Sequence, residues 1–174
     1  QWASGQDQIT AISSDIPNVG LKGDYFTSYL YMSEEFAPWE GTVMSIDPSG
    51  RGEDRTGYAV IKMLHGVLYL TAVGALEGGY SDETLEQLSR IAKKQDVNYV
   101  VIESNFGDGM ATQLLKPVMS RIHPCEIEEV RHSIQKEKRI IDTLEPIMNT
   151  HRLVVDEDII KQDFQLPPDH QLFR

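Results

Sequence analysis

The chain has 174 residues, enough for one domain with a substantial hydrophobic core. Its net charge of −11, from 16 lysines and arginines against 27 aspartates and glutamates, argues against a protein that coats nucleic acid by bulk attraction. An enzyme that meets DNA through a local basic patch stays possible. A single cysteine, Cys125, excludes a disulfide framework and a cysteine-based zinc site, and no apolar run reaches the roughly 18 residues of a membrane span.

Residues 1–40 show no sustained hydrophobic period. We interpret them as a linker or lead-in from an upstream domain, and the alternative is a loop of the domain that follows. Within them, the aromatic stretch 25–32 could pair as a strand. Because the first residue is glutamine, we expect the chain to be part of a longer protein. Residues 41–174 then form the domain proper.

Three apolar runs predict successive antiparallel strands over 42–47, 58–64 and 67–75. His65-Gly66 between the second and third runs is typical of a tight hairpin link. Ser81 is a good N-cap for a helix that should end near residue 95.

The second half of the chain alternates strands and helices. A continuous apolar run at 98–103 predicts a central strand, buried on both faces. The further predicted elements are a helix at 110–122, a strand at 126–130, a helix at 135–148 and a strand at 152–155. Three antiparallel strands followed by parallel strands and helices predict a mixed α/β sheet covered on both faces, the layout of the ribonuclease H-like fold.

Two acids stand where apolar strands end, Asp47 after the first and Glu103 after the fourth. If these strands are parallel neighbours, the two carboxylates share one cleft. Hard oxygen ligands of this kind suit Mg²⁺ or Mn²⁺, and two such ions can hydrolyse a phosphodiester. The alternative is that each acid is structural, a turn residue or a surface residue. Asp54 could bind a second metal, or equally be a solvated turn residue.

Basic residues gather before and at the start of the third predicted helix. They are Arg131, Lys136, Lys138 and Arg139. A loop and helix start rich in lysine and arginine can hold a phosphate backbone. The alternative is a solvated helix face, because Glu137 is interleaved.

Three stretches together resemble the nuclease domain of large terminase subunits from tailed bacteriophages, with details nearest to the T7-like phages. SIDPSGRGEDRTGYAVI resembles the first acidic motif, VVIESNFGDGM the second, and KEKRIIDTLEPIMNTHRLVV the stretch that follows. The resemblance covers about residues 41–155. Three motifs in the right order are more specific than any one of them.

The resemblance implies a ribonuclease H-like endonuclease behind an N-terminal packaging ATPase, cutting concatemeric double-stranded DNA during packaging into a procapsid. Asp47 would bridge two Mg²⁺ or Mn²⁺ ions and Glu103 would be the second acid, with Lys136 and Arg139 near the DNA. Its expected partners are the portal or procapsid, the small terminase subunit and further copies in a pentameric ring. We expect no membrane partner and a location in the host cell cytoplasm.

One feature of the family pattern is missing from this sequence. A third acid, expected late in the domain, is not found, because Asp156 and Asp158 follow the preceding helix too soon. We therefore expect the domain at 41–174 to be incomplete at its C-terminus. Two alternatives stay open: another ribonuclease H-like enzyme, such as a junction resolvase or RNase H, or a non-catalytic module that docks on the portal or procapsid.

Overall fold

A six-stranded sheet forms the centre of the computed structural model, which describes residues 2–3, 16, 22–27, 36–49, 55–103, 109–131 and 135–172. The strands of this sheet are β3 (Gly41–Asp47), β4 (Thr56–Leu64), β5 (Val67–Leu76), β6 (Tyr99–Glu103), β7 (Glu126–Val130) and β8 (Leu153–Val155). The helices are α1 (Asp82–Gln95), α2 (Met110–Ile122), α3 (Lys136–Asn149), α4 (Glu157–Asp163) and a 3-10 turn (Pro168–His170). Two short strands, β1 (Trp2–Ala3) and β2 (Tyr25–Phe26), pair with each other.

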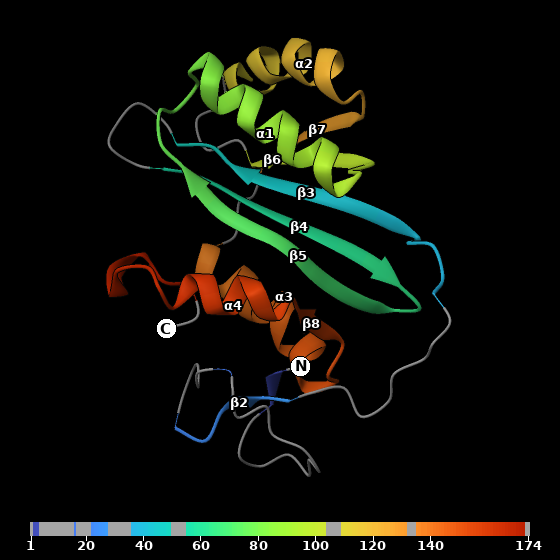
Figure 1. Ribbon diagram of the computed structural model, residues 1–174, viewed down its shortest axis with the longest axis vertical. Coiled ribbons are helices and arrows are strands. Elements are labelled where there is room, and N and C mark those ends of the chain that lie inside the picture. Colours follow the sequence, from blue (N-terminus) through green and yellow to red (C-terminus); the bar gives the residue numbers. More distant parts are fainter. Residues whose placement is uncertain are drawn as a thin grey trace.

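The strand order is β7-β6-β3-β4-β5-β8. Neighbours β3, β4 and β5 are antiparallel, whereas β6 is parallel to β3, β7 to β6 and β8 to β5. Helices α1 and α2 cover one face and α3 and α4 lie on the other (Figure 1). The predicted mixed sheet is confirmed, and the strands and helices predicted between residues 42 and 155 match their observed bounds to within two residues. Of the stretch 25–32, only Tyr25–Phe26 is a strand, and residues 28–32 lie outside the described part of the chain.

The link between β4 and β5 shows why the sequence predicts a hairpin there. His65 and Gly66 have φ angles of 51° and 75°, so both central residues of this two-residue turn have positive φ. Turns of this class match the right-handed twist of the flanking strands. Within the described part of the chain, no helix has the length and apolar character needed to cross a membrane.

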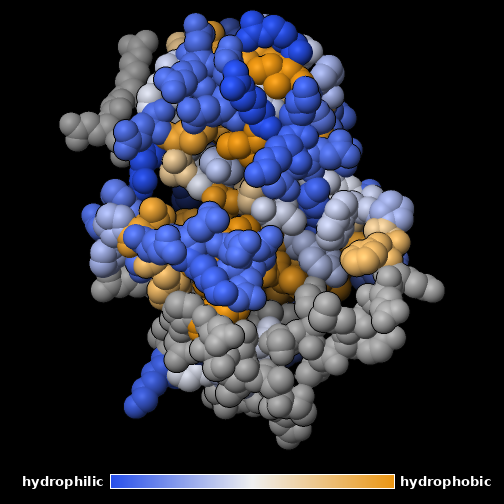
Figure 2. Space-filling model, in the orientation of Figure 1, coloured by the Kyte–Doolittle hydropathy of each residue, from blue (hydrophilic) through white to orange (hydrophobic). Residues whose placement is uncertain are grey.

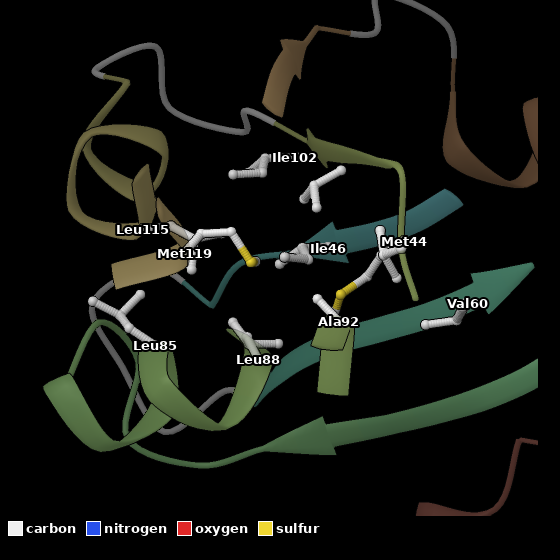
Figure 3. Packing of buried hydrophobic residues seen from close by; sticks show 11 residues of the cluster. Met44, Ile46, Val60, Leu85, Leu88, Ala92, Ile102, Leu115 and Met119 are labelled. Carbon is white, nitrogen blue, oxygen red and sulfur yellow. The ribbon is translucent and has the colours of Figure 1, made fainter. Parts of the chain in front are cut away.

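The main core lies between the sheet and helices α1 and α2 (Figure 3). Successive residues of a strand face opposite sides, so Met44 and Ile46, at 0% and 2% exposure, point into this core while Val43 is 39% exposed. The outer surface of the two helices is mostly hydrophilic (Figure 2). The buried members of the core are Met44, Ile46, Val60, Leu85, Leu88, Ala92, Val97, Val100, Ile102, Leu115 and Met119.

Helix α1 begins as the sequence predicts. The Ser81 hydroxyl accepts a hydrogen bond from the backbone N–H of Thr84 at 3.3 Å and so satisfies one of the helix's free donors. The N-cap position of α2, in contrast, is Gly109 with φ 61°, and no side chain of the described residues caps this helix.

A smaller cluster lies on the opposite face of the sheet, where Phe26 packs with Ile160 of α4. Phe26 is 3% exposed, so this part of residues 1–40 packs on the domain. The boundary at residue 40, and the role of the residues before it as a lead-in, stay predictions. The sequence missed α4, which is only seven residues long, is capped by Asp156 and buries Ile160.

Candidate metal and phosphate site

Asp47 and Glu103 end two adjacent parallel strands on the same face of the sheet. The β3–β6 register pairs Ile46 with Ile102, and the two acids follow this last pair. Because Ile46 and Ile102 point into the core, Asp47 and Glu103 point to the opposite face. Neighbouring strands lie about 4.8 Å apart, so the two side chains start side by side. The predicted juxtaposition of the first and fourth strands is confirmed.

The first turn of α3 places two cations on these two acids. The Lys136 ammonium donates to Asp47 Oδ2 at 2.6 Å. Arg139 Nη2 donates to Glu103 Oε1 at 2.9 Å and to Glu103 Oε2 at 3.1 Å. Lys136 and Arg139 are three residues apart on a helix and therefore share one of its faces. The sequence predicted all four residues but not that each cation would pair with an acid.

The two ion pairs differ in their exposure to water. The Lys136 and Asp47 side chains are 58% and 38% exposed, whereas Arg139 and Glu103 are only 21% and 20% exposed. The hydrogen bond to Asp47, followed by the charges of Asp47 and Glu103, raises the pKa of Lys136 above its ordinary value despite partial burial. Lys136 therefore carries a full positive charge at neutral pH.

Two neighbouring features fix the end of β3. The antiparallel partner of Asp47 is Gly57, so β4 presents no side chain beside this acid, and a Cβ at Gly57 would lie 4.0 Å from the Asp47 Cβ. Beyond Asp47, the backbone N–H of Ser49 donates to the Thr56 hydroxyl oxygen at 3.1 Å, and the two hydroxyls are also 3.1 Å apart. Ser49 and Thr56 are buried, so this contact fixes the chain as it leaves the acid. A sequence signal of this arrangement is the glycine directly before the predicted strand 58–64.

The remaining predicted site residues have different outcomes. Lys138 is exposed in the first turn of α3, and Arg131 is exposed directly after β7. Arg131 follows Val130, the partner of Glu103 in the β6–β7 register, so it lies near the end of the strands that carry the acids. Asp54 lies outside the described residues, and its role stays a prediction.

The third acid is not found among the described residues, where no group of three or more histidine, cysteine, aspartate or glutamate side chains could hold a metal. Asp156 instead caps α4 by accepting from the N–H of Asp158 at 2.9 Å. Glu129 lies opposite Ile102 and so faces α2, where it accepts a hydrogen bond from the Thr112 hydroxyl at 3.0 Å. It is therefore on the wrong face to join Asp47 and Glu103.

The donor set still fits a hard divalent cation. Two carboxylates offer four oxygens at one end of the sheet, and ions such as Mg²⁺ complete their shell with waters and substrate phosphates. The Asp47 pair is solvent-accessible, so an ion can reach it from water. The arrangement suits a divalent cation bound beside two basic side chains, Lys136 and Arg139.

Comparisons with known proteins agree with this geometry. Residues 46–153 match the family described as Terminase Bacteriophage T7, Ribonuclease H-like domain. The large terminase subunit of Enterobacteria phage T3 is 46% identical over 157 residues, which cover 90% of this chain and 27% of that protein. The chain therefore spans about a quarter of the length of this relative.

Two solved structures share the fold. The manganese-soaked terminase nuclease domain of human cytomegalovirus matches with a TM-score of 0.54 at 9% identity, covering 68% of this chain and 65% of that one. The large terminase nuclease of the thermophilic phage G20c matches with a TM-score of 0.50 at 15% identity, covering 69% and 61%. At these identities the likeness concerns the fold alone.

Proposed function

The chain belongs to the T7-type terminase ribonuclease H-like domain family, and from that premise we propose that it is a metal-dependent DNA endonuclease domain. Its substrate is concatemeric double-stranded DNA, cut during packaging into a procapsid. One observation carries this proposal: Asp47 and Glu103 follow the last residue pair of two parallel strands on one face of the sheet. That placement gives an oxygen-rich site where a metal can bind.

Asp47 and Glu103 are the residues that would hold the metal, as two Mg²⁺ or Mn²⁺ ions. Ions bound there would supply an activated water and stabilise the leaving oxygen of a phosphodiester. The chemistry of the two carboxylates supports this choice of metal. The solved terminase nuclease domains described as manganese-soaked and zinc-bound are in line with a divalent ion.

The cations at the start of α3 would bind the substrate. Lys136 and Arg139 already lie within hydrogen-bond distance of the acids, so a phosphate held by them would lie beside any ion bound there. Arg131 and Lys138, both exposed, would extend the contact along the DNA backbone. The third acid of the family pattern would come from outside the described residues.

The wider assignment rests on family membership. The full-length protein would carry a packaging ATPase domain, act in the host cell cytoplasm, and work as a ring, expected to be pentameric, on the portal of the procapsid with the small terminase subunit. The 46% identity to the phage T3 large terminase subunit supports this assignment.

The test of the proposal is plasmid cleavage with Mg²⁺ or Mn²⁺ by the full-length domain. Asp47→Ala should abolish cleavage, and Asp142→Ala is the matched control, because Asp142 is exposed on α3 away from its first turn. If Asp47→Ala cleaves as well as the parent chain, the assignment fails.

Substrate comparison separates the alternatives. A preference for branched DNA or for an RNA–DNA hybrid over linear duplex DNA would favour a resolvase or an RNase H. A chain that binds no Mn²⁺ specifically would instead be a docking module.

A further inference from the structure

The carboxylates that would hold a metal already accept hydrogen bonds from protein cations. Arg139 contacts both carboxylate oxygens of Glu103, and Lys136 contacts Oδ2 of Asp47. A divalent ion bound to the same two carboxylates would lie within a few ångströms of an ammonium and a guanidinium group. At such distances like charges repel strongly where water is partly excluded, as it is around Glu103.

Helix α3 has few other attachments to the described part of the molecule. None of its side chains is buried, and its apolar residues Ile140, Ile141 and Leu144 are 45%, 56% and 37% exposed. At its far end the chain turns into β8, where Arg152 N–H donates to the Ile147 carbonyl at 3.0 Å. Among the contacts of the described residues, the two ion pairs at its first turn are therefore a large share of what holds the start of the helix against the sheet.

We propose that Lys136 and Arg139 form an exchangeable cation clamp, which holds the acids when metal is absent and leaves them when metal binds. The released cations are then free to bind a DNA phosphate. This inference rests on the proposed function, because it takes Asp47 and Glu103 as the metal ligands. Lys136 and Arg139 are positioning residues in this scheme.

The net charge of the site couples metal binding to DNA binding. Two acids and two cations are together neutral, so adding a divalent ion leaves an excess of positive charge. DNA phosphates, each with one negative charge, offset part of that excess, so metal and DNA should each strengthen the binding of the other by the same factor. The clamp thus keeps metal affinity low until DNA is present.

The experiment measures Mn²⁺ binding to the metal-free chain without DNA, by the electron paramagnetic resonance signal of free Mn²⁺. Lys136→Met keeps a side chain of similar length but removes the charge. It should lower the dissociation constant for Mn²⁺ about two- to fivefold, the range expected for the loss of an exposed ion pair. Lys136→Arg should restore the parent affinity. Lys138→Met is the matched control, since Lys138 lies in the same turn and makes no ion pair with the described residues.

Two results would overturn the clamp. One is an equal change in Lys136→Met and Lys138→Met, which would mean that only general charge matters. The other is weaker Mn²⁺ binding by Lys136→Met, which would mean that the lysine supports the metal ligand instead of competing with the metal.

A second readout needs no metal affinity. Amide hydrogen exchange over α3 should quicken severalfold in metal-free Lys136→Met and on adding Mn²⁺ to the parent chain, but not in Lys138→Met. Unchanged exchange in both of the first two cases would contradict the clamp.

The clamp and the proposed function fail separately. Loss of cleavage in Asp47→Ala with no change of Mn²⁺ affinity in Lys136→Met overturns the clamp alone. Intact cleavage in Asp47→Ala overturns the proposed function, whatever Lys136→Met does to the exchange of α3.

Discussion

The two faces of strands β3 and β6 differ sharply, although they are made of alternating residues of the same segments. Toward α1 and α2 the strands present Met44, Ile46 and Ile102, all at most 2% exposed and packed into one apolar cluster. Toward α3 they present Asp47 and Glu103, which meet charged partners. The alternation lets one face carry the stability of the domain and leaves the other free for chemistry.

The largest expected effect is a loss of stability from a substitution on the apolar face. Met44→Ala should lower the free energy of unfolding by about 2–5 kcal/mol, because the lost side chain leaves a cavity in a closed core. Val43→Ala, the next residue on the opposite face, is the control and should cost less than about 1 kcal/mol. Urea denaturation measures both, and equal losses would mean that the two faces do not differ in packing.

The next effect is a loss of cleavage from a substitution on the charged face. Glu103→Gln should reduce Mn²⁺-dependent cleavage at least about a hundredfold, because a metal ligand contributes several kcal/mol to the transition state. Its free energy of unfolding should fall by about 1–3 kcal/mol, because the mostly buried Arg139 loses its two hydrogen bonds to a charged carboxylate.

Glu128→Gln is the control for that variant. Glu128 is exposed on the same face of the neighbouring strand, opposite Val101 and away from the strand end. Equal cleavage by both variants would contradict the role proposed for Glu103 as a metal ligand.

A smaller effect tests how the end of β3 is fixed beyond the acid. Thr56→Val removes the acceptor for the buried Ser49 N–H and should cost about 1–3 kcal/mol in the free energy of unfolding. Thr71→Val is the matched control, because the buried Thr71 hydroxyl has no hydrogen-bond partner among the described residues. That control should be neutral or stabilising, and a larger loss in it than in Thr56→Val would contradict the role given to Ser49 and Thr56.

The smallest effect concerns pH. The contact with Asp47 raises the pKa of Lys136 above its ordinary 10.5 in the folded chain. Its stabilisation is therefore complete below the unfolded-state pKa and is lost as the pH rises through the folded-state pKa. Lys136 is well exposed, so the ion pair should contribute at most about 0.5 kcal/mol after solvent screening. The difference in unfolding free energy between the parent chain and Lys136→Met should stay constant below pH 10.5 and shrink as the pH rises above it, and a difference that grows would contradict the assignment.

Most of the fold could be read from local patterns. Alternating apolar residues, the His65-Gly66 turn and the Ser81 cap each encode a short-range preference that the packed structure keeps. The sequence did not predict the seven-residue helix α4, because so short a helix depends on burying Ile160 against Phe26, which is distant in the sequence. Helix α3 forms where the sequence predicts it, but none of its side chains is buried against the described residues.

The candidate site divides in the same way. The sequence by itself determined that Asp47 and Glu103 end apolar strands and that basic residues open a helix, because these are properties of neighbouring residues. Only the tertiary structure decided that the two acids share a face and that Lys136 and Arg139 pair with them. The Lys136–Asp47 contact spans 89 residues of chain. The register of parallel strands and the path of α3 over the sheet bring such residues together, and no local pattern records either.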